Sequence, residues 1–150
     1  MKYRFGSYVV YKEMDCYLIS RKEWRIVSKD IKSQKLGFKA YEAGFPYYKK
    51  IDKTDIQSGY FVRTKAKYKD FTFELFQNEA LKNDYKVRLK LNNLDFDAYD
   101  YFGFPYRNDD ASIEVNEEEL EEIWEERKPL ARFPFKTEKI KFIKKEGEFL

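Results

Sequence analysis

The sequence contains no histidine, the side chain that most often serves as a general base near neutral pH. Its absence also excludes Ser–His and Cys–His nucleophile pairs and the commonest zinc ligand. The six glycines are scattered, and none belongs to a phosphate-binding loop of the form G-x-x-x-x-G-K-[ST]. We therefore expect a protein that is not an enzyme and that holds no cofactor.

Cysteine and long apolar runs are also scarce. The single cysteine, Cys16, cannot form an internal disulfide. No stretch approaches the roughly 18 apolar residues of a membrane span. The N-terminal segment starts with basic residues but lacks an apolar signal core. We expect a cytoplasmic protein without a membrane partner.

Aromatic residues, by contrast, are abundant, with 14 Phe and 13 Tyr among 150 residues. Hydrophobic residues make up 43% of the chain, enough for a core despite 38% charged residues. Aromatic side chains suit a pleated, half-buried surface. The composition thus predicts a mainly β protein of the α+β class.

Two short stretches are written twice. Residues 11–20 (YKEMDCYLIS) align without a gap with residues 68–77 (YKDFTFELFQ), so that Cys16 corresponds to Phe73 and is interpreted as a buried apolar thiol. Residues 44–47 (GFPY) recur as residues 103–106. Self-similarity of this kind indicates a duplicated module. We predict a first β repeat over residues 1–57 and a second over residues 58–150, packed as one cooperative body.

Each repeat contains short apolar runs separated by charged turns, which is typical of antiparallel strands. The predicted strands are residues 8–11, 16–19, 24–27, 48–51, 61–69, 71–76, 85–91, 113–115 and 139–143. Asp52 and Asn116 are predicted N-caps of a helical turn near the end of each repeat. Five short strands with such a turn before the last are the layout of SH3-like and related small barrels. We therefore predict two tandem SH3-like β units.

One α-helix is predicted over residues 117–127 (EEELEEIWEER). Acidic residues lie at its N-terminal end and basic residues at its C-terminal end, as the helix dipole favours. Leu120, Ile123, Trp124 and Arg127 fall at the spacing of one helix face. This pattern leaves the glutamates on the outward face.

Charge is distributed unevenly, although the net charge is only +3. The balance is +10 over residues 1–90, −12 over residues 91–126 and +5 over residues 127–150. In the acidic segment, carboxylates alternate with aromatic side chains, as in interface hot spots that attract a basic partner. The D-x-D-x-x-D spacing does not match an EF-hand, so we predict no metal site. The predicted partner-binding residues are Asp95, Phe96, Asp97, Tyr99, Asp100, Tyr101, Asp109, Asp110, Glu118, Glu121, Glu122 and Glu125.

A second interpretation concerns two lysine-rich strand faces. Their basic residues are interleaved with aromatic side chains that could stack on bases, a pattern of single-strand nucleic-acid binding. The same pattern also fits a solvated sheet face, or an edge that lysines protect from aggregation. A nucleic-acid-binding module therefore stays as the alternative. The residues involved are Lys65, Lys67, Lys69, Lys86, Arg88 and Lys90.

Three sequence features together resemble a known class of proteins. They are Tyr11-Lys12, the run Tyr48-Lys49-Lys50-Ile51, and the acidic stretch Glu119-Leu120-Glu121-Glu122-Ile123-Trp124-Glu125-Glu126-Arg127. In a small chain without catalytic residues, this pattern resembles immunity proteins of bacterial polymorphic toxin and contact-dependent inhibition systems. The basic first half departs from that class, whose members against nucleases tend to be acidic. The resemblance implies a cytoplasmic inhibitor that binds a cognate toxin domain and covers its active site. It specifies neither the toxin nor the oligomeric state.

Overall fold

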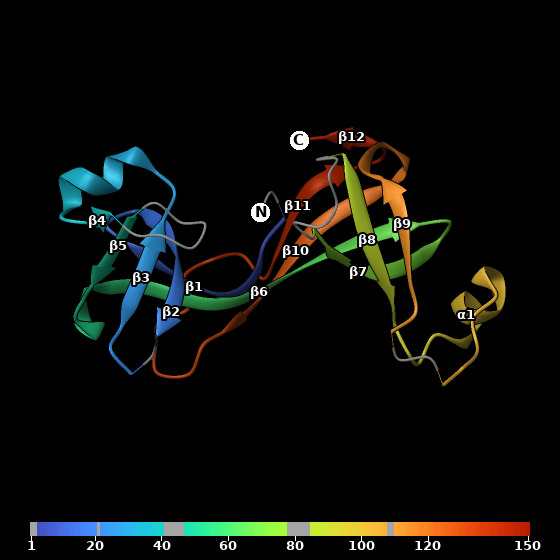
Figure 1. The fold of residues 1–150 in the computed structure, drawn as a ribbon, viewed down its shortest axis with the longest axis horizontal. Helices are drawn as coiled ribbons and strands as arrows, with labels where there is room; N and C mark the ends of the chain where they lie inside the picture. Colours follow the sequence, from blue (N-terminus) through green and yellow to red (C-terminus); the bar gives the residue numbers. More distant parts are fainter. Residues whose placement is uncertain (1–2, 21, 41–46, 78–84, 108–109) are drawn as a thin grey trace. The chain divides into compact units, whose positions relative to one another are not determined.

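A computed structural model of the chain describes residues 3–20, 22–40, 47–77, 85–107 and 110–150 (Figure 1). The protein is mainly β, as its composition predicts, with one α-helix in the described residues. Contacts divide the chain into unit 1 (Met1–Phe5, Arg63–Glu126 and Lys139–Leu150) and unit 2 (Gly6–Val62 and Arg127–Glu138). These units are defined by contacts within the fold and not by sequence repeats. The predicted repeat boundary between residues 57 and 58 therefore stays a prediction.

Unit 2 is built on strands in the order β6-β1-β2-β3-β5-β4. Consecutive pairs from β1 to β4 in this order are antiparallel. Two short 3₁₀ helices, η1 and η2, lie before β4 and before β6. The bounds are β1 (Phe5–Tyr11), β2 (Met14–Ser20), β3 (Arg25–Ser28), η1 (Ile31–Leu36), β4 (Lys39–Ala40), β5 (Tyr47–Lys50), η2 (Lys53–Asp55) and β6 (Ile56–Tyr68).

Unit 1 contains the second half of β6, which pairs with β7, and the antiparallel series continues through β8 to β9. On its other side β6 neighbours β10, followed by β11 and β12. Helix α1 connects β8 to β9 and lies beyond the ends of these strands (Figure 1). The bounds are β7 (Phe71–Phe76), β8 (Lys86–Leu91), α1 (Phe96–Phe102), β9 (Ser112–Asn116), η3 (Glu117–Glu119), β10 (Glu122–Pro129), β11 (Ile140–Lys145) and β12 (Glu148–Phe149).

Each unit has its own hydrophobic core, supplied by the alternate residues of its strands. The alternation predicted over residues 85–91 is wrong at Tyr85, which precedes β8 and is 63% exposed instead of buried. Within β8 the alternation is confirmed, since Lys86 and Lys90 are exposed and the buried side chains are Val87, Leu89 and Leu91. These side chains belong to the core of unit 1. The core of unit 2 includes residues from β1, β2, β3 and β6, namely Val9, Tyr11, Cys16, Leu18, Ile26 and Ile56. None of the helices among the described residues has the length and apolar character that crossing a bilayer requires.

The ten-residue repeat forms the same hairpin twice. Both turns have two central residues with positive φ, 45° and 70° at Lys12-Glu13 and 52° and 66° at Lys69-Asp70. Positive φ at both positions is the geometry of a type I′ turn, which matches the twist of a hairpin. The register is also equal, because Cys16 lies opposite Val9 and Phe73 lies opposite Ala66. Cys16 is buried, as predicted from its alignment with Phe73.

Of the two GFPY motifs, only the second is fully described. Residues 44–46 of the first motif lie outside the described residues. In the second motif, Gly103 has φ +76° and forms the left-handed C-cap of α1. This conformation is one that glycine adopts without steric penalty.

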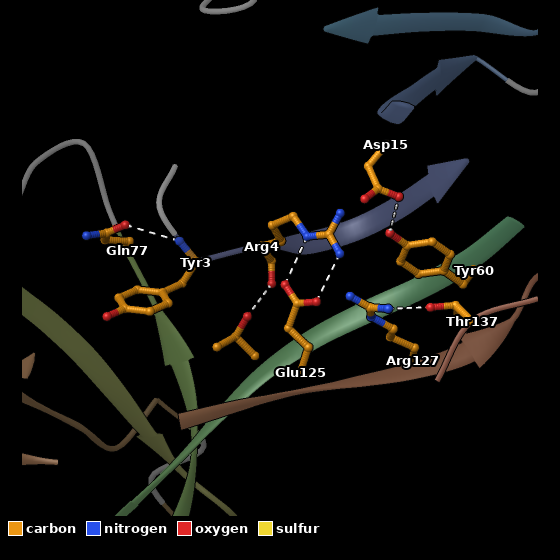
Figure 2. Close-up of polar contacts among 9 residues, drawn as sticks. Tyr3, Arg4, Asp15, Tyr60, Gln77, Glu125, Arg127 and Thr137 are labelled. Atoms are coloured by element: carbon orange, nitrogen blue, oxygen red, sulfur yellow. Dashed lines mark hydrogen bonds and ion pairs between the residues drawn. The ribbon is translucent and has the colours of Figure 1, made fainter. Parts of the chain in front are cut away.

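The prediction of an α-helix over residues 117–127 is wrong. This segment forms the short η3 helix and then strand β10, in which Ile123, Glu125 and Arg127 are buried and alternate with half-buried residues. The buried face of the strand therefore contains two charged side chains, which a hydrophobicity pattern assigns to solvent. Glu125 is satisfied by Arg4, whose Nε and Nη2 each donate a hydrogen bond of 2.9 Å to its carboxylate (Figure 2). The segment thus has a period-2 alternation whose buried positions include paired charges, and this pattern resembles a helical stripe in the sequence.

The Arg4–Glu125 pair allows a direct test of this explanation. Replacing Glu125 with Gln leaves the Arg4 guanidinium without its counter-charge, and we expect the free energy of unfolding to fall by about 3 kcal/mol. The double variant Arg4→Met/Glu125→Leu should recover most of this loss, because apolar side chains then replace both charges. Urea unfolding followed by circular dichroism measures both effects.

The matched control is Glu126→Gln, which loosens a more exposed pair with Lys65 at 3.5 Å. Its effect should stay below about 1 kcal/mol. Equal losses for Glu125→Gln and Glu126→Gln would show that the buried pair does not stabilise β10.

Candidate functional site

The centre of the predicted partner-binding segment is helix α1. Asp95 is the N-cap of α1, and its Oδ1 accepts a hydrogen bond of 3.2 Å from the Ala98 N–H. Asp97 lies in the first turn, where the helix dipole favours a carboxylate. Gly103 ends the helix, with its N–H bonded to the Tyr99 carbonyl. The sequence contains an N-cap aspartate and a C-terminal glycine, but the segment is short and all its apolar residues except Ala98 are aromatic.

One side of α1 is fixed to the core of unit 1. Ala98 and Tyr99 are fully buried, so Tyr99 anchors the helix and does not contribute to an exposed surface. The Phe102 ring contacts Phe71 and Phe73 at centroid distances of 5.9 and 5.7 Å. These contacts fix the orientation of the helix and therefore of the side chains on its outward side.

The outward side carries large apolar side chains beside carboxylates. Leu94 is 77% exposed, Phe96 52%, Tyr101 60% and Tyr106 52%. Asp97 and Asp100 are exposed on the same helix. We refer to Leu94, Phe96, Asp97, Asp100, Tyr101 and Tyr106 as the α1 surface.

Tyr106 was not among the predicted site residues, although it ends the repeated GFPY motif. Its ring meets Phe96 edge-on with centroids 5.1 Å apart. Its hydroxyl donates a hydrogen bond of 2.5 Å to Asp100, and this bond raises the pKa of Tyr106. The two contacts hold an aromatic pair and a carboxylate in one arrangement.

The predicted glutamates are divided among different environments. Glu125 is buried against Arg4, so it cannot form an exposed contact surface. Glu118 is exposed on η3, and Glu122 is half-buried on β10. Glu121 lies 3.8 Å from the Lys67 ammonium and accepts a weak hydrogen bond of 3.4 Å from the Asp70 N–H.

The β6–β7 turn is a neighbour of both groups of predicted residues. Asp70 contacts Glu121, and the adjacent Phe71 ring lies 5.4 Å from the Tyr101 ring. The structure therefore brings Glu121 and Tyr101 to the same hairpin turn. Asp110 is exposed, whereas Asp109 lies outside the described residues.

Two aspartates of the segment also make contacts within the chain. Asp95 caps the helix, and Asp100 accepts the Tyr106 hydroxyl. In the described part of the chain, no group of three or more cysteine or carboxylate side chains is arranged to hold a metal ion.

The lysine-rich strand faces lie on a single face of the sheet in unit 1. The register places Lys65 and Lys90 on either side of Glu74. A groove of about 400 Å³ passes over these residues towards Asn92 and Asp95. Neighbouring carboxylates offset much of the positive charge, with Arg63–Glu74 at 2.7 Å, Arg88–Glu114 at 3.0 Å, Lys65–Glu126 at 3.5 Å and Lys67–Glu121 at 3.8 Å.

Cys16, the chain's one thiol, is buried in the core of unit 2. Burial, with smaller contributions from Asp15 and Asp30, raises the pKa of Cys16 to about 12. The thiol is therefore protonated at neutral pH, whereas a cysteine nucleophile acts as the thiolate.

This raised pKa predicts a loss of stability in alkaline solution. The unfolded thiol ionises near 9.0 and the folded one near 12, so the contribution from the protonated thiol is complete below pH 9 and lost as pH rises towards 12. We expect Cys16→Ala to be less stable than the wild type at pH 8 because of its cavity. The difference should shrink with rising pH in urea unfolding curves, and parallel pH profiles would contradict this assignment.

Comparison with known proteins identifies one family. The model of the family described as Uncharacterised conserved protein UCP033725 matches residues 3–131 of the chain. No curated protein and no solved structure matches the chain.

Proposed function

This chain belongs to the family of uncharacterised conserved proteins whose model it matches, and we propose that it is an immunity protein that binds and inhibits a cognate toxin domain. The observation that carries the proposal is the α1 surface, where Phe96 and Tyr101 are more than half exposed beside exposed Asp97 and Asp100. The resemblance of the sequence to immunity proteins supports the same class.

The physical properties of the α1 surface fit protein recognition. Aromatic side chains bury large areas and supply much of the energy at interface hot spots. Here they project from a helix that Tyr99 and Phe102 fix to the core, so little conformational entropy is lost on binding. The carboxylates accelerate association with a basic partner.

Inhibition in this proposal requires no chemistry from the chain itself. The α1 surface covers a basic cleft of the toxin, with Phe96 and Tyr101 as anchors and Asp97 and Asp100 facing its cations. Asp110 and Glu118 are exposed carboxylates that extend the acidic character of unit 1. A toxin with an anionic substrate would be blocked in this way, because its substrate-binding cations are then occupied.

We also propose that the chain consists of two SH3-like barrel units derived from an internal duplication. The two hairpins with equal turns and register support this origin. A second correspondence follows it in the chain. Lys49 of β5 lies opposite Ile26, and Ile113 of β9 lies opposite Leu89 in the same way. A 3₁₀ helix follows each strand, η2 after β5 and η3 after β9.

A nucleic-acid-binding function on the lysine-rich strand faces ranks below the immunity function. The ion pairs with Glu74, Glu114, Glu121 and Glu126 reduce the charge that this face presents to a phosphate backbone. Among the described residues, no lysine or arginine lies within ion-pair distance of Asp97 or Asp100 on the α1 surface.

The first experiment identifies the partner. A photo-crosslinking amino acid at Tyr101, and separately at the exposed control position Ile140, is introduced into the full chain in its native host. We expect a crosslink from position 101 alone, to a protein encoded by a neighbouring reading frame that is toxic unless this chain is co-produced. Equal crosslinking from both positions, or a neighbour without toxicity, would contradict the proposal.

The charges of the α1 surface should control the rate of association with that partner. We expect Asp97→Lys/Asp100→Lys to slow association at least tenfold in dilute salt, because steering by charge complementarity is reversed. The dependence of the rate on salt should also weaken, as stopped-flow fluorescence measures. The charge-matched control is Glu146→Lys/Glu148→Lys in the exposed β11–β12 hairpin, and an equal slowing by this control would mean that net charge alone is sensed.

The aromatic anchors should instead control dissociation. Removing the Phe96 and Tyr101 rings one at a time as alanine variants is expected to raise the dissociation rate by about 30-fold, the value for a hot spot of about 2 kcal/mol. Ile140→Ala removes an apolar side chain of similar exposure from strand β11 of unit 1 and should have no effect. Surface plasmon resonance compares the three variants, and unchanged dissociation for both aromatic variants would remove the α1 surface from the interface.

A further inference from the structure

Unit 2 contains a groove with an unusual lining. It has a volume of about 340 Å³ and is lined by Arg25, Lys39, Lys49 and Lys50 together with Gly37 and Tyr48. None of these lining residues is acidic. The cations come from the neighbouring strands β3, β5 and β4, which lie side by side in Figure 1. This groove plays no part in the proposed toxin-binding surface, which belongs to unit 1.

The strand register places like charges against one another at this groove. Arg25 lies directly opposite Lys50, and Lys39 lies opposite Tyr48. Like charges in directly opposed positions destabilise a sheet. An anion bound between the two cations would relieve this repulsion.

Lys49 is held in position at the groove by neutral acceptors. Its ammonium donates to the Leu36 carbonyl at 2.7 Å and to the Tyr11 hydroxyl at 3.0 Å. Gly37 leaves room for it, because a Cβ at this position would lie 3.0 Å from Lys49 Nζ, and the φ of +89° also favours glycine. The register places Lys49 opposite Ile26, on the other face of β5 from Lys50, so it adds positive charge at the border of the groove.

Little negative charge in the unit offsets these cations. Arg25 is paired with Glu23 at 2.8 Å. No carboxylate of the described residues lies within ion-pair distance of Lys39, Lys49 or Lys50. By sequence, unit 2 contains 15 basic and 8 acidic residues, a net charge of +7, whereas unit 1 has a net charge of −4.

We infer that this groove binds phosphate groups, either of single-stranded nucleic acid or of a free polyphosphate. Arg25, Lys39 and Lys50 share one face of the sheet at this groove, and three cations around a small volume suit the high charge density of phosphate. A guanidinium also binds phosphate oxygens in pairs. Tyr48 adds an aromatic ring beside these cations, and the combination of basic groove and stacking ring is the means of binding single strands. Both ligands would be bound through their phosphate groups. Only the nucleic acid has bases that can stack on the Tyr48 ring.

The test measures binding of a fluorescein-labelled oligothymidine to the full chain by fluorescence anisotropy at several salt concentrations. We expect Lys39→Gln/Lys50→Gln to weaken binding by about 25-fold at 0.1 M salt and to reduce the salt slope by about 1.4, which is about 0.7 for each phosphate that a lysine no longer neutralises. The melting temperature of this variant should equal or exceed that of the wild type, because like charges have been removed.

Sodium tripolyphosphate and hexaglutamate are then compared as competitors. Displacement by tripolyphosphate at far lower concentration than by hexaglutamate supports a phosphate site. Loss of oligothymidine affinity by about fivefold or more in Tyr48→Leu, with tripolyphosphate affinity unchanged, assigns the groove to nucleic acid. If both affinities are unchanged in Tyr48→Leu, the site takes free polyphosphate.

The charge-matched control is Lys32→Gln/Lys128→Gln, which removes two exposed cations of unit 2 outside the groove. Equal weakening by this control would overturn the proposal, since net charge alone would then explain binding. Equal displacement by hexaglutamate, or the absence of saturable binding, would overturn it as well. None of these outcomes depends on the α1 surface, so the proposed toxin inhibition is tested separately.

Discussion

The register of the two repeated hairpins decides which side chains each unit buries. Side chains alternate between the two faces of a strand, so a slip by one residue would move Lys65 and Lys67 into the core and Ala66 out of it. Two-residue turns of type I′ geometry prevent this slip, because they leave only one pairing of the flanking strands. The burial of Cys16 and Phe73 at equal positions follows from this register.

Within unit 1, buried polar groups join segments that are distant in the chain. The Tyr3 hydroxyl donates to the buried Glu117 carboxylate at 2.6 Å, and this burial and hydrogen bond raise the pKa of Tyr3. Lys144 is buried as well and donates to the carbonyls of Glu117 and Glu118, while burial lowers its pKa. The η3 helix is thus held by the N-terminal segment on one side and by β11 on the other. Buried charges of this kind give a unit one specific arrangement when all partners are satisfied.

The two units have different surfaces although their hairpins are alike. In unit 1 the connection between β8 and β9 forms α1, with its exposed aromatic and acidic side chains. In unit 2 the connection between β3 and β5 contains η1 and β4, which contribute Gly37 and Lys39 to a basic groove. Connections carry the chemical differences because they are under less packing constraint than the strands. The two proposed sites therefore differ in the charge of their surfaces.

The sequence by itself determined the local features of this protein. The alternation of β8, the two hairpins, the N-cap position of Asp52 and Asn116 and the burial of Cys16 all follow from short-range patterns, because neighbouring residues set the turn geometry and the face of a strand. The acidic and aromatic character of the segment around α1 was also evident, although its helical form was not.

Only the tertiary structure decided which charged and aromatic residues are buried. Glu125 lies in a strand because Arg4, 121 residues away in the chain, neutralises it in the interior. Tyr99 is buried and anchors α1, whereas Tyr106 lies at the surface with its ring against Phe96. The basic groove exists because β3, β4 and β5 meet in one register. A charge is buried only where a partner compensates its lost hydration, and that partner is specified by folding and not by neighbours in sequence.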